Sequence, residues 1–111
     1  MDAFTDIQYE VSDPVALIRL NRPEKLNAFD YHTLAEIRSA VDAAVADRSV
    51  VGIVITGNGR GFSAGLDSQA LLDVAGTDGG PRRTASDANA ELPGLFSYFY
   101  SVPKPIVAAI N

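Results

Sequence analysis

The chain has 111 residues, 47% of them hydrophobic, and its nine basic and fourteen acidic residues give a net charge of −5. This length suits one domain that can bury a core, and the acidic balance argues against a nucleic-acid partner, because neutralising phosphates requires a basic face. The absence of cysteine excludes a disulfide framework, a thiolate nucleophile and a cysteine-based zinc site. A single histidine disfavours a histidine-rich metal centre, so we expect no metal.

No segment is apolar over the length needed to span a bilayer. The N-terminus, which carries Asp2 and Asp6, lacks the basic and apolar regions of a signal peptide. We therefore expect a cytoplasmic protein with no membrane partner.

Two strands joined by a turn are predicted at the start of the chain. Residues 4–11 and 15–20 have strand composition, and Ser12-Asp13-Pro14 between them has the composition of a hairpin turn. The second strand is apolar at most positions, which predicts a strand covered on both faces. Proline and asparagine then interrupt regular structure, so residues 21–29 are predicted to form a loop.

Arg19, Arg22 and Lys25 form a local basic cluster at the end of the second strand. A ligand with phosphates would find counter-charges there. Three separate solvated charges are the plainer interpretation of the same residues.

An amphipathic helix is predicted over residues 30–47, with Asp30 as its N-cap. Its apolar residues recur every three or four positions, and the opposite face is expected to carry charged residues that include Glu36. His32 falls in the first turn and is interpreted as an exposed residue rather than a catalytic base, because no acid is spaced to orient it. A strand, a helix and a strand in succession predict a right-handed crossover.

The stretch from Val51 to Asp67 organises the chain. A short apolar run at its start predicts a strand buried on both faces, and Gly57 bounds it. Four glycines follow within nine residues (Gly57, Gly59, Gly61 and Gly65). Backbone without Cβ atoms lets amides approach a ligand closely. Asp67 is placed to cap a helix over residues 68–74.

This glycine-rich stretch is open to three chemical interpretations. A dinucleotide fingerprint would need glycine at Phe62, and a phosphate-binding Walker loop would need Gly-Lys there, so both fail. Residues 61–65 match G-x-S-x-G, the nucleophile elbow of serine hydrolases, with Ser63 as nucleophile, but His32 precedes that serine instead of following it. In the third interpretation the backbone N–H of Leu66 forms an oxyanion hole. A glycine loop that merely connects two elements is the remaining alternative.

The rest of the chain is less informative. Residues 75–90 contain few apolar side chains and are predicted to be a flexible loop. Pro93 suits the first turn of an aromatic-faced helix that reaches Tyr100, and residues 106–110 have the composition of a final strand.

Three motifs in order give the chain a resemblance. Thr56 to Asp67, with G-x-G-x-x-F-S-A-G-x-D, resembles the first oxyanion-hole segment of the enoyl-CoA hydratase/isomerase (crotonase) superfamily. Asn21-Arg22-Pro23 with Asn27-Ala28, and the run from Lys104 to Asn111, match the family's upstream and downstream anchors. The resemblance implies an α/β fold of the ClpP/crotonase type, a superhelix of repeated β-β-α units. Residues 1–111 would be the N-terminal part of that spiral domain, its N-terminal half only, with residues 75–90 as an active-site loop.

The same resemblance implies a site. The backbone N–H of Leu66 would be one oxyanion donor, while the second donor and the acid and base residues would lie beyond Asn111. Substrate and coenzyme A contacts are expected at Lys25, Ala28, Ser63, Ala64, Gly65, Asp67 and Ser68. Ser68 departs from the aliphatic residue that is usual in the family.

The resemblance also implies a function. We expect an acyl-CoA thioester enzyme, first an enoyl-CoA hydratase and second an isomerase or another reaction of the family, with no cofactor besides the coenzyme A of the substrate. The full-length protein would be a homo-trimer or hexamer, and the fragment alone would be inactive. A non-catalytic interaction module is the alternative from another class.

Overall fold

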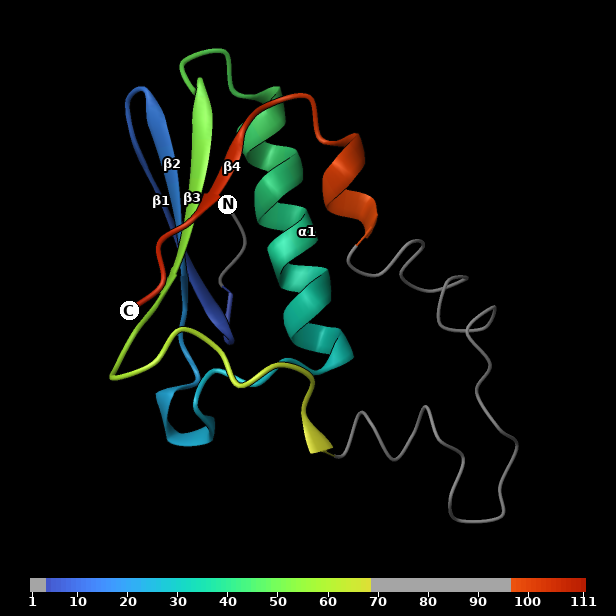
Figure 1. The fold of residues 1–111 in the computed structure, drawn as a ribbon. Helices are drawn as coiled ribbons and strands as arrows, with labels where there is room; N and C mark the ends of the chain where they lie inside the picture. The colour runs from blue at the N-terminus through green and yellow to red at the C-terminus, as the bar shows by residue number, and fades with distance from the viewer. Residues whose placement is uncertain (1–3, 69–96) are drawn as a thin grey trace, which may run out of the picture.

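The computed structural model describes residues 4–68 and 97–111. Its elements form one sheet and one long helix, which lies along a face of the sheet (Figure 1). In chain order they are β1 (Ile7–Ser12), β2 (Val15–Leu20), the 3-10 helix η1 (Pro23–Lys25), α1 (Tyr31–Ala46), β3 (Gly52–Gly57), the 3-10 helix η2 (Ser97–Ser101) and β4 (Ile106–Ala108).

The strand order in the sheet is β1-β2-β3-β4. The pair β1 and β2 is an antiparallel hairpin, which confirms the predicted turn, whereas β3 runs parallel to both β2 and β4. The register pairs Leu20 with Gly57, the last residues of β2 and β3. Because the carboxyl ends of these parallel strands meet at one edge, the loops that follow them leave the sheet side by side, below the strands in Figure 1.

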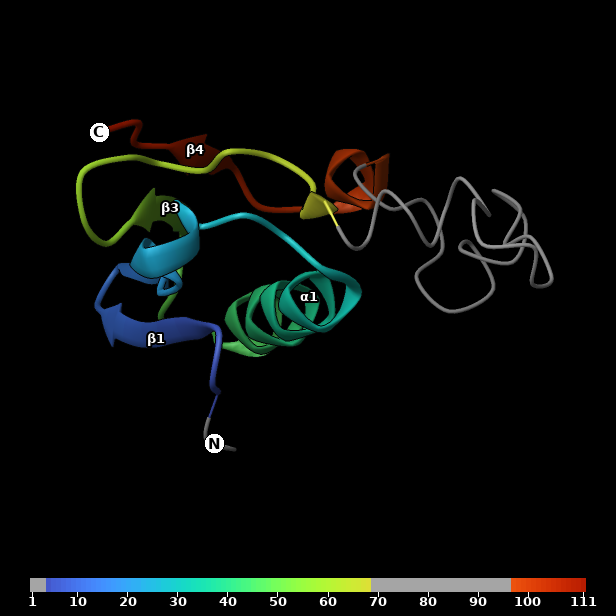
Figure 2. The same cartoon turned by 90° about the horizontal axis from the view of Figure 1, so that it is seen from below.

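The core lies between α1 and one face of the sheet. In β2 the buried residues alternate, at Ala16, Ile18 and Leu20, and they pack with Ile37 and Val41 of α1. The expected burial of β2 and the strand after α1 on both faces is therefore wrong for the described residues, because one helix covers one face. Figure 2 shows α1 beside β1, with β4 at the opposite edge of the sheet.

Both ends of α1 are held by polar side chains. Asp30 accepts a hydrogen bond from the Thr33 amide at 2.8 Å, and Thr33 completes a capping box, so the predicted N-cap is confirmed. At the other end Lys104 Nζ donates to the carbonyl oxygens of Ala44 and Asp47, at 2.9 and 2.8 Å. A positive charge there also complements the negative end of the helix dipole.

The side chain of Tyr98 fastens η2 to α1. Its hydroxyl donates to Asp42, and the Arg38 guanidinium lies 4.1 Å from the ring centre. Burial and the bond to Asp42 raise the pKa of Tyr98 to about 12, although the charge of Arg38 acts to lower it. The hydroxyl therefore keeps its proton throughout the neutral range.

Element boundaries differ from the predictions at several points. The first strand begins at Ile7, and the last ends at Ala108. The described part of the predicted aromatic helix is a 3-10 helix, Ser97–Ser101. The predicted helix over residues 68–74 and loop over 75–90 lie almost wholly outside the described residues. In residues 4–68 and 97–111 no helix is long and apolar enough to cross a membrane.

We expect Lys104→Met to destabilise the fold by about 1–2 kcal/mol, because two carbonyl groups lose a charged donor. Chemical denaturation monitored by circular dichroism gives the free energy of unfolding. Arg48→Met is the matched control, since Arg48 is exposed near the same helix end. A loss for Lys104→Met no larger than that of the control would contradict this account of the helix end.

Candidate active site

Asn27 joins the two loops that leave β2 and β3. Its side chain is buried, with 1% of its surface exposed. Oδ1 accepts from the Arg22 amide at 2.7 Å, and Nδ2 donates to the carbonyl oxygens of Asn58 and Gly61 at 2.9 and 3.0 Å. The first loop, residues 21–30, is thereby fixed against the second, residues 58–67.

A parallel bridge between Phe29 and Leu66 sets the direction of the candidate oxyanion donor. The amide of Phe29 donates to the Gly65 carbonyl at 2.8 Å, and the amide of Asp67 donates to the Phe29 carbonyl. In such a ladder the residue between the two bonded neighbours turns its own N–H away from the partner strand. Consistent with this, no acceptor within the described parts of the chain takes the N–H of Leu66.

Two glycines are required by this geometry. Gly65 has a φ of +92°, a backbone conformation that residues with a side chain rarely adopt. A Cβ on Gly57 would lie 2.5 Å from the Phe62 carbonyl oxygen and 2.7 Å from that of Gly61. The loop therefore closes tightly on the end of β3, and the peptide that carries the Leu66 N–H follows a left-handed glycine.

The hydroxyl of Ser63 is used to build the loop. It donates to the Asn27 carbonyl at 2.8 Å and accepts from the Gly65 amide at 3.0 Å. The histidine that a serine hydrolase would place on this hydroxyl is instead paired elsewhere, since His32 Nε2 lies 3.0 Å from Glu36. The arrangement favours the backbone interpretation over the nucleophile elbow.

The Arg22 side chain holds the two loops together and does not belong to an exposed basic cluster. Its Nη1 donates to the Ala28 carbonyl at 2.7 Å, and Nη2 lies 3.5 Å from Asp67. Both side chains are largely buried, with 14% and 13% exposed. Arg19 pairs with Glu10 on the sheet. Neither interpretation of the three charges describes Arg22, which is paired and largely buried, whereas Lys25 is exposed. Phosphate binding at Lys25 stays a prediction.

The predicted site residues gather around the bridge. Ala28 precedes Phe29 and is buried, Gly65 and Asp67 flank Leu66, and Ser68 is exposed just after them. Lys25 lies on η1. Their contacts with coenzyme A stay predictions.

Two cavities open on the described residues. One of about 320 Å³ adjoins Ser63 and Ala64, which were predicted, and Leu26, Arg60, Gly61 and Phe62, which were not. Leu26 has φ 54° and Arg60 is exposed, and neither carries a motif that sequence reasoning could have used. Leu66 is not among the residues that line this cavity.

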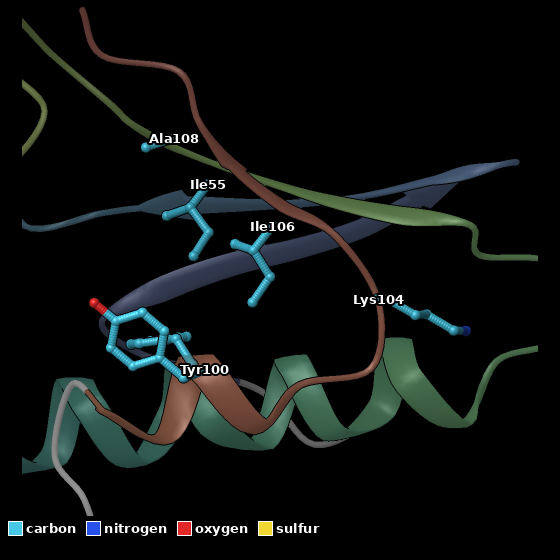
Figure 3. A pocket seen from close by; sticks show the side chains of 6 residues that line it. Ile55, Tyr100, Lys104, Ile106 and Ala108 are labelled. Atoms are coloured by element: carbon cyan, nitrogen blue, oxygen red, sulfur yellow. The ribbon is translucent and has the colours of Figure 1, made fainter.

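The second cavity, of about 380 Å³, lies between the β3–β4 edge and η2 (Figure 3). Figure 3 shows Ile55 and Ile106 extending from the sheet toward Tyr100, while the Lys104 side chain points away. Its lining is mainly apolar and consists of Ile55, Phe99, Tyr100, Lys104, Ile106 and Ala108.

Among the described residues, one cluster of possible metal ligands lies at the start of α1, where the helix meets the residues before β1. It comprises Asp6, His32 and Glu36. His32 is exposed as predicted, with 62% of its side chain accessible, but the expectation that no acid orients it is wrong, because Glu36 stands one helical turn on. Glu36 was expected on the polar face and is buried, at 8% exposed, because it accepts the amides of Thr5 and Asp6.

These bonds control the ionisation of Glu36. Burial acts to raise the pKa of its carboxyl, but the bonds from the Thr5 and Asp6 amides and the charge of His32 outweigh it and lower the pKa below its usual value. The ionised carboxylate therefore stabilises the folded state. It also fixes residues 5–6 to α1, and β1 begins directly after them at Ile7.

Sequence similarity relates the chain to known proteins. The family model described as enoyl-CoA hydratase/isomerase matches residues 10–111. The chain is 31% identical over 110 residues to a crotonyl-CoA hydratase of Syntrophomonas wolfei, covering 98% of this chain and 40% of that protein. It is 34% identical over 99 residues to human enoyl-CoA delta isomerase 2, covering 89% of this chain and 24% of that protein.

Solved structures give the same result. The crystal structure of an enoyl-CoA hydratase/isomerase from Xanthobacter autotrophicus Py2 matches with a TM-score of 0.78 and 34% identity, over 98% of this chain and 39% of that one. The chain therefore belongs to the enoyl-CoA hydratase/isomerase family and has the crotonase fold, of which it represents the N-terminal portion. It spans 24–40% of the length of the curated relatives named above.

The stability contributed by Glu36 is expected to depend on pH. A lowered pKa in the folded state means that the contribution is complete above the unfolded pKa of about 4.3 and is lost as the pH falls through the folded value. Glu36→Gln should therefore be less stable than the wild type at pH 6, with a difference that shrinks as the pH is lowered toward about 3. Denaturation at several pH values measures this, with exposed Glu24→Gln as control. A pH-independent difference would refute the assignment.

Gly57→Ala should disrupt the junction of β3 and its loop, because the new methyl group would meet two carbonyl oxygens. We expect a loss of about 2–4 kcal/mol, as for overpacked or strained positions. Gly61→Ala is the control, since a Cβ there meets nothing within 4 Å. Equal stabilities of the two variants, measured by thermal unfolding, would show that the loop closes less tightly than described.

Proposed function

We propose that the protein carrying this chain is an enoyl-CoA hydratase, which adds water across the double bond of a 2-enoyl-CoA. The observation that carries the proposal is the N–H of Leu66, which the bridge to Phe29 turns away from its neighbours and which follows a glycine at φ +92°. An amide held in this way can stabilise charge that develops on a carbonyl oxygen. Crotonyl-CoA hydratase of Syntrophomonas wolfei and 2,3-dehydroadipyl-CoA hydratase of Escherichia coli, 36% identical over 97 residues, support this reaction.

In the proposed mechanism the thioester oxygen of the substrate accepts a hydrogen bond from the Leu66 N–H. Polarisation of the carbonyl makes the β-carbon electrophilic, and attack by water places negative charge on this oxygen as an enolate. The proposed reaction also requires a second amide, a base that takes a proton from the attacking water and an acid that delivers a proton to the α-carbon as the enolate collapses, and residues 1–111 are not proposed to supply them. One such amide donor is worth about 3–4 kcal/mol of barrier.

The substrate's coenzyme A is the only cofactor-like group in this proposal. The residues proposed to contact the substrate and its coenzyme A are Lys25, Ala28, Ser63, Ala64, Gly65, Asp67 and Ser68. The cavity of about 320 Å³ beside Ser63 and Ala64 supports this placement. Exposed Arg60 on its rim offers a charge to a phosphate.

An isomerase is the second candidate, and the 34% identity to human enoyl-CoA delta isomerase 2 favours it. One carboxylic group would then shuttle a proton across the enolate instead of a pair activating water. Both reactions use the same N–H of Leu66. Assaying both 2-enoyl-CoA and 3-enoyl-CoA thioesters separates them.

A non-catalytic interaction module is the candidate from another class. The observation in its favour is the exposure of Tyr100, Val107 and Ile110, with 94%, 58% and 76% of their surfaces accessible. As the enzyme, the protein is proposed to be a homo-trimer or hexamer in the cytoplasm, although a Dictyostelium discoideum relative is described as a mitochondrial enoyl-CoA hydratase. Oligomerisation without any response to acyl-CoA would favour the module.

Removing the N–H of Leu66 tests the proposal. Replacing the residue by its α-hydroxy acid exchanges the amide for an ester and retains the side chain. We expect kcat for hydration of a 2-enoyl-CoA to fall by a factor on the order of 10² to 10³. Leu66→Ala keeps the N–H and is the control, expected within about tenfold of the wild type. Hydration that survives the ester substitution would overturn the oxyanion role.

A further inference from the structure

Arg22 holds both sides of the bridge on which the proposed donor depends. Its guanidinium donates to the carbonyl of Ala28, the residue before Phe29, and lies 3.8 Å from Asp30, the residue after it. On the other side it lies 3.5 Å from Asp67, the residue after Leu66. One planar cation therefore joins the neighbours of both bridge residues.

The placement of Asp67 gives this contact an electrostatic consequence. Its carboxylate is largely buried, at 13% exposed, and belongs to the residue after the proposed donor. A buried negative charge there disfavours a second negative charge on the thioester oxygen. Arg22, itself 14% exposed, offsets that charge in surroundings where solvent screens little.

We infer that Arg22 is a positioning residue, which aims the Leu66 N–H by holding the bridge and cancels the charge of Asp67 beside the forming oxyanion. This inference rests on the proposed function. The guanidinium suits both roles, since its planar fork reaches a carbonyl and carboxylates together. A lysine offers the charge but not the planar fork.

The test is a double-mutant cycle in the hydration reaction, with Arg22→Met, Asp67→Asn and the pair together. Arg22→Met should lower kcat by a factor on the order of 10 to 100, with a smaller change in KM, because the lost interaction acts in the transition state. The double variant should regain at least part of the lost kcat, because the buried carboxylate that has lost its contact with Arg22 is gone. Arg22→Lys should fall between Met and the wild type.

A merely structural role predicts a different pattern. The free energy of unfolding would then fall in Arg22→Met and recover in the double variant, because removing both members of a buried pair leaves no uncompensated charge, while kcat measured with every variant folded would not change. That result would overturn the inference while leaving the hydratase proposal intact. Wild-type protein that turns over no enoyl-CoA thioester would instead refute the proposed function.

A second measurement tests the positioning role without turnover. The amide of Asp67, which donates to the Phe29 carbonyl, should exchange hydrogen about tenfold faster in Arg22→Met than in the wild type if the guanidinium holds the bridge. Arg48→Met is the matched control, because Arg48 is exposed and far along the chain from both loops. Equal exchange rates in the two variants would overturn the inference, whatever the activity.

Discussion

The site depends on the bridge between Phe29 and Leu66. Two backbone bonds hold residues 65 and 67 to Phe29, and this leaves the N–H between them directed outward. Nothing about the Leu66 side chain is needed for that role. In the proposed role, donation by the backbone has the advantage that its direction is fixed by the fold before substrate binds, so no reorganisation is needed when charge develops.

The sheet and the core bring the two halves of this bridge together. The pairing of Leu20 with Gly57 releases both loops at one edge, and the buried face of β2 packed on α1 keeps that register, because a slip of one residue would turn Ala16, Ile18 and Leu20 to the other face. The Asn27 side chain then joins the loops by hydrogen bonds to backbone carbonyls, and Arg22 joins them by its ion pair with Asp67. If the proposed site is the active site, stability and chemistry are coupled at this edge.

Local features were predictable from the sequence, and long-range pairs were not. The Asp30 cap, the hairpin turn and the irregular loop after β2 follow from composition and spacing within a few residues, and the glycine loop with its family resemblance located the candidate donor. Glu36 was misplaced on the polar face because its partners Thr5 and Asp6 lie about thirty residues away. Arg22 was assigned to solvent or phosphate for the same reason, since Asp67 meets it only through the sheet register.

The central claim is that the N–H of Leu66 meets the thioester oxygen. Its most direct test is the chemical shift of that amide in ¹⁵N-labelled protein during titration with a 3-ketoacyl-CoA, whose enolate places negative charge on this oxygen. The account predicts a downfield proton shift at Leu66 that exceeds the shifts of the other loop amides, as expected for a strengthened, charge-assisted hydrogen bond. Saturating binding that leaves the Leu66 amide unshifted would contradict it.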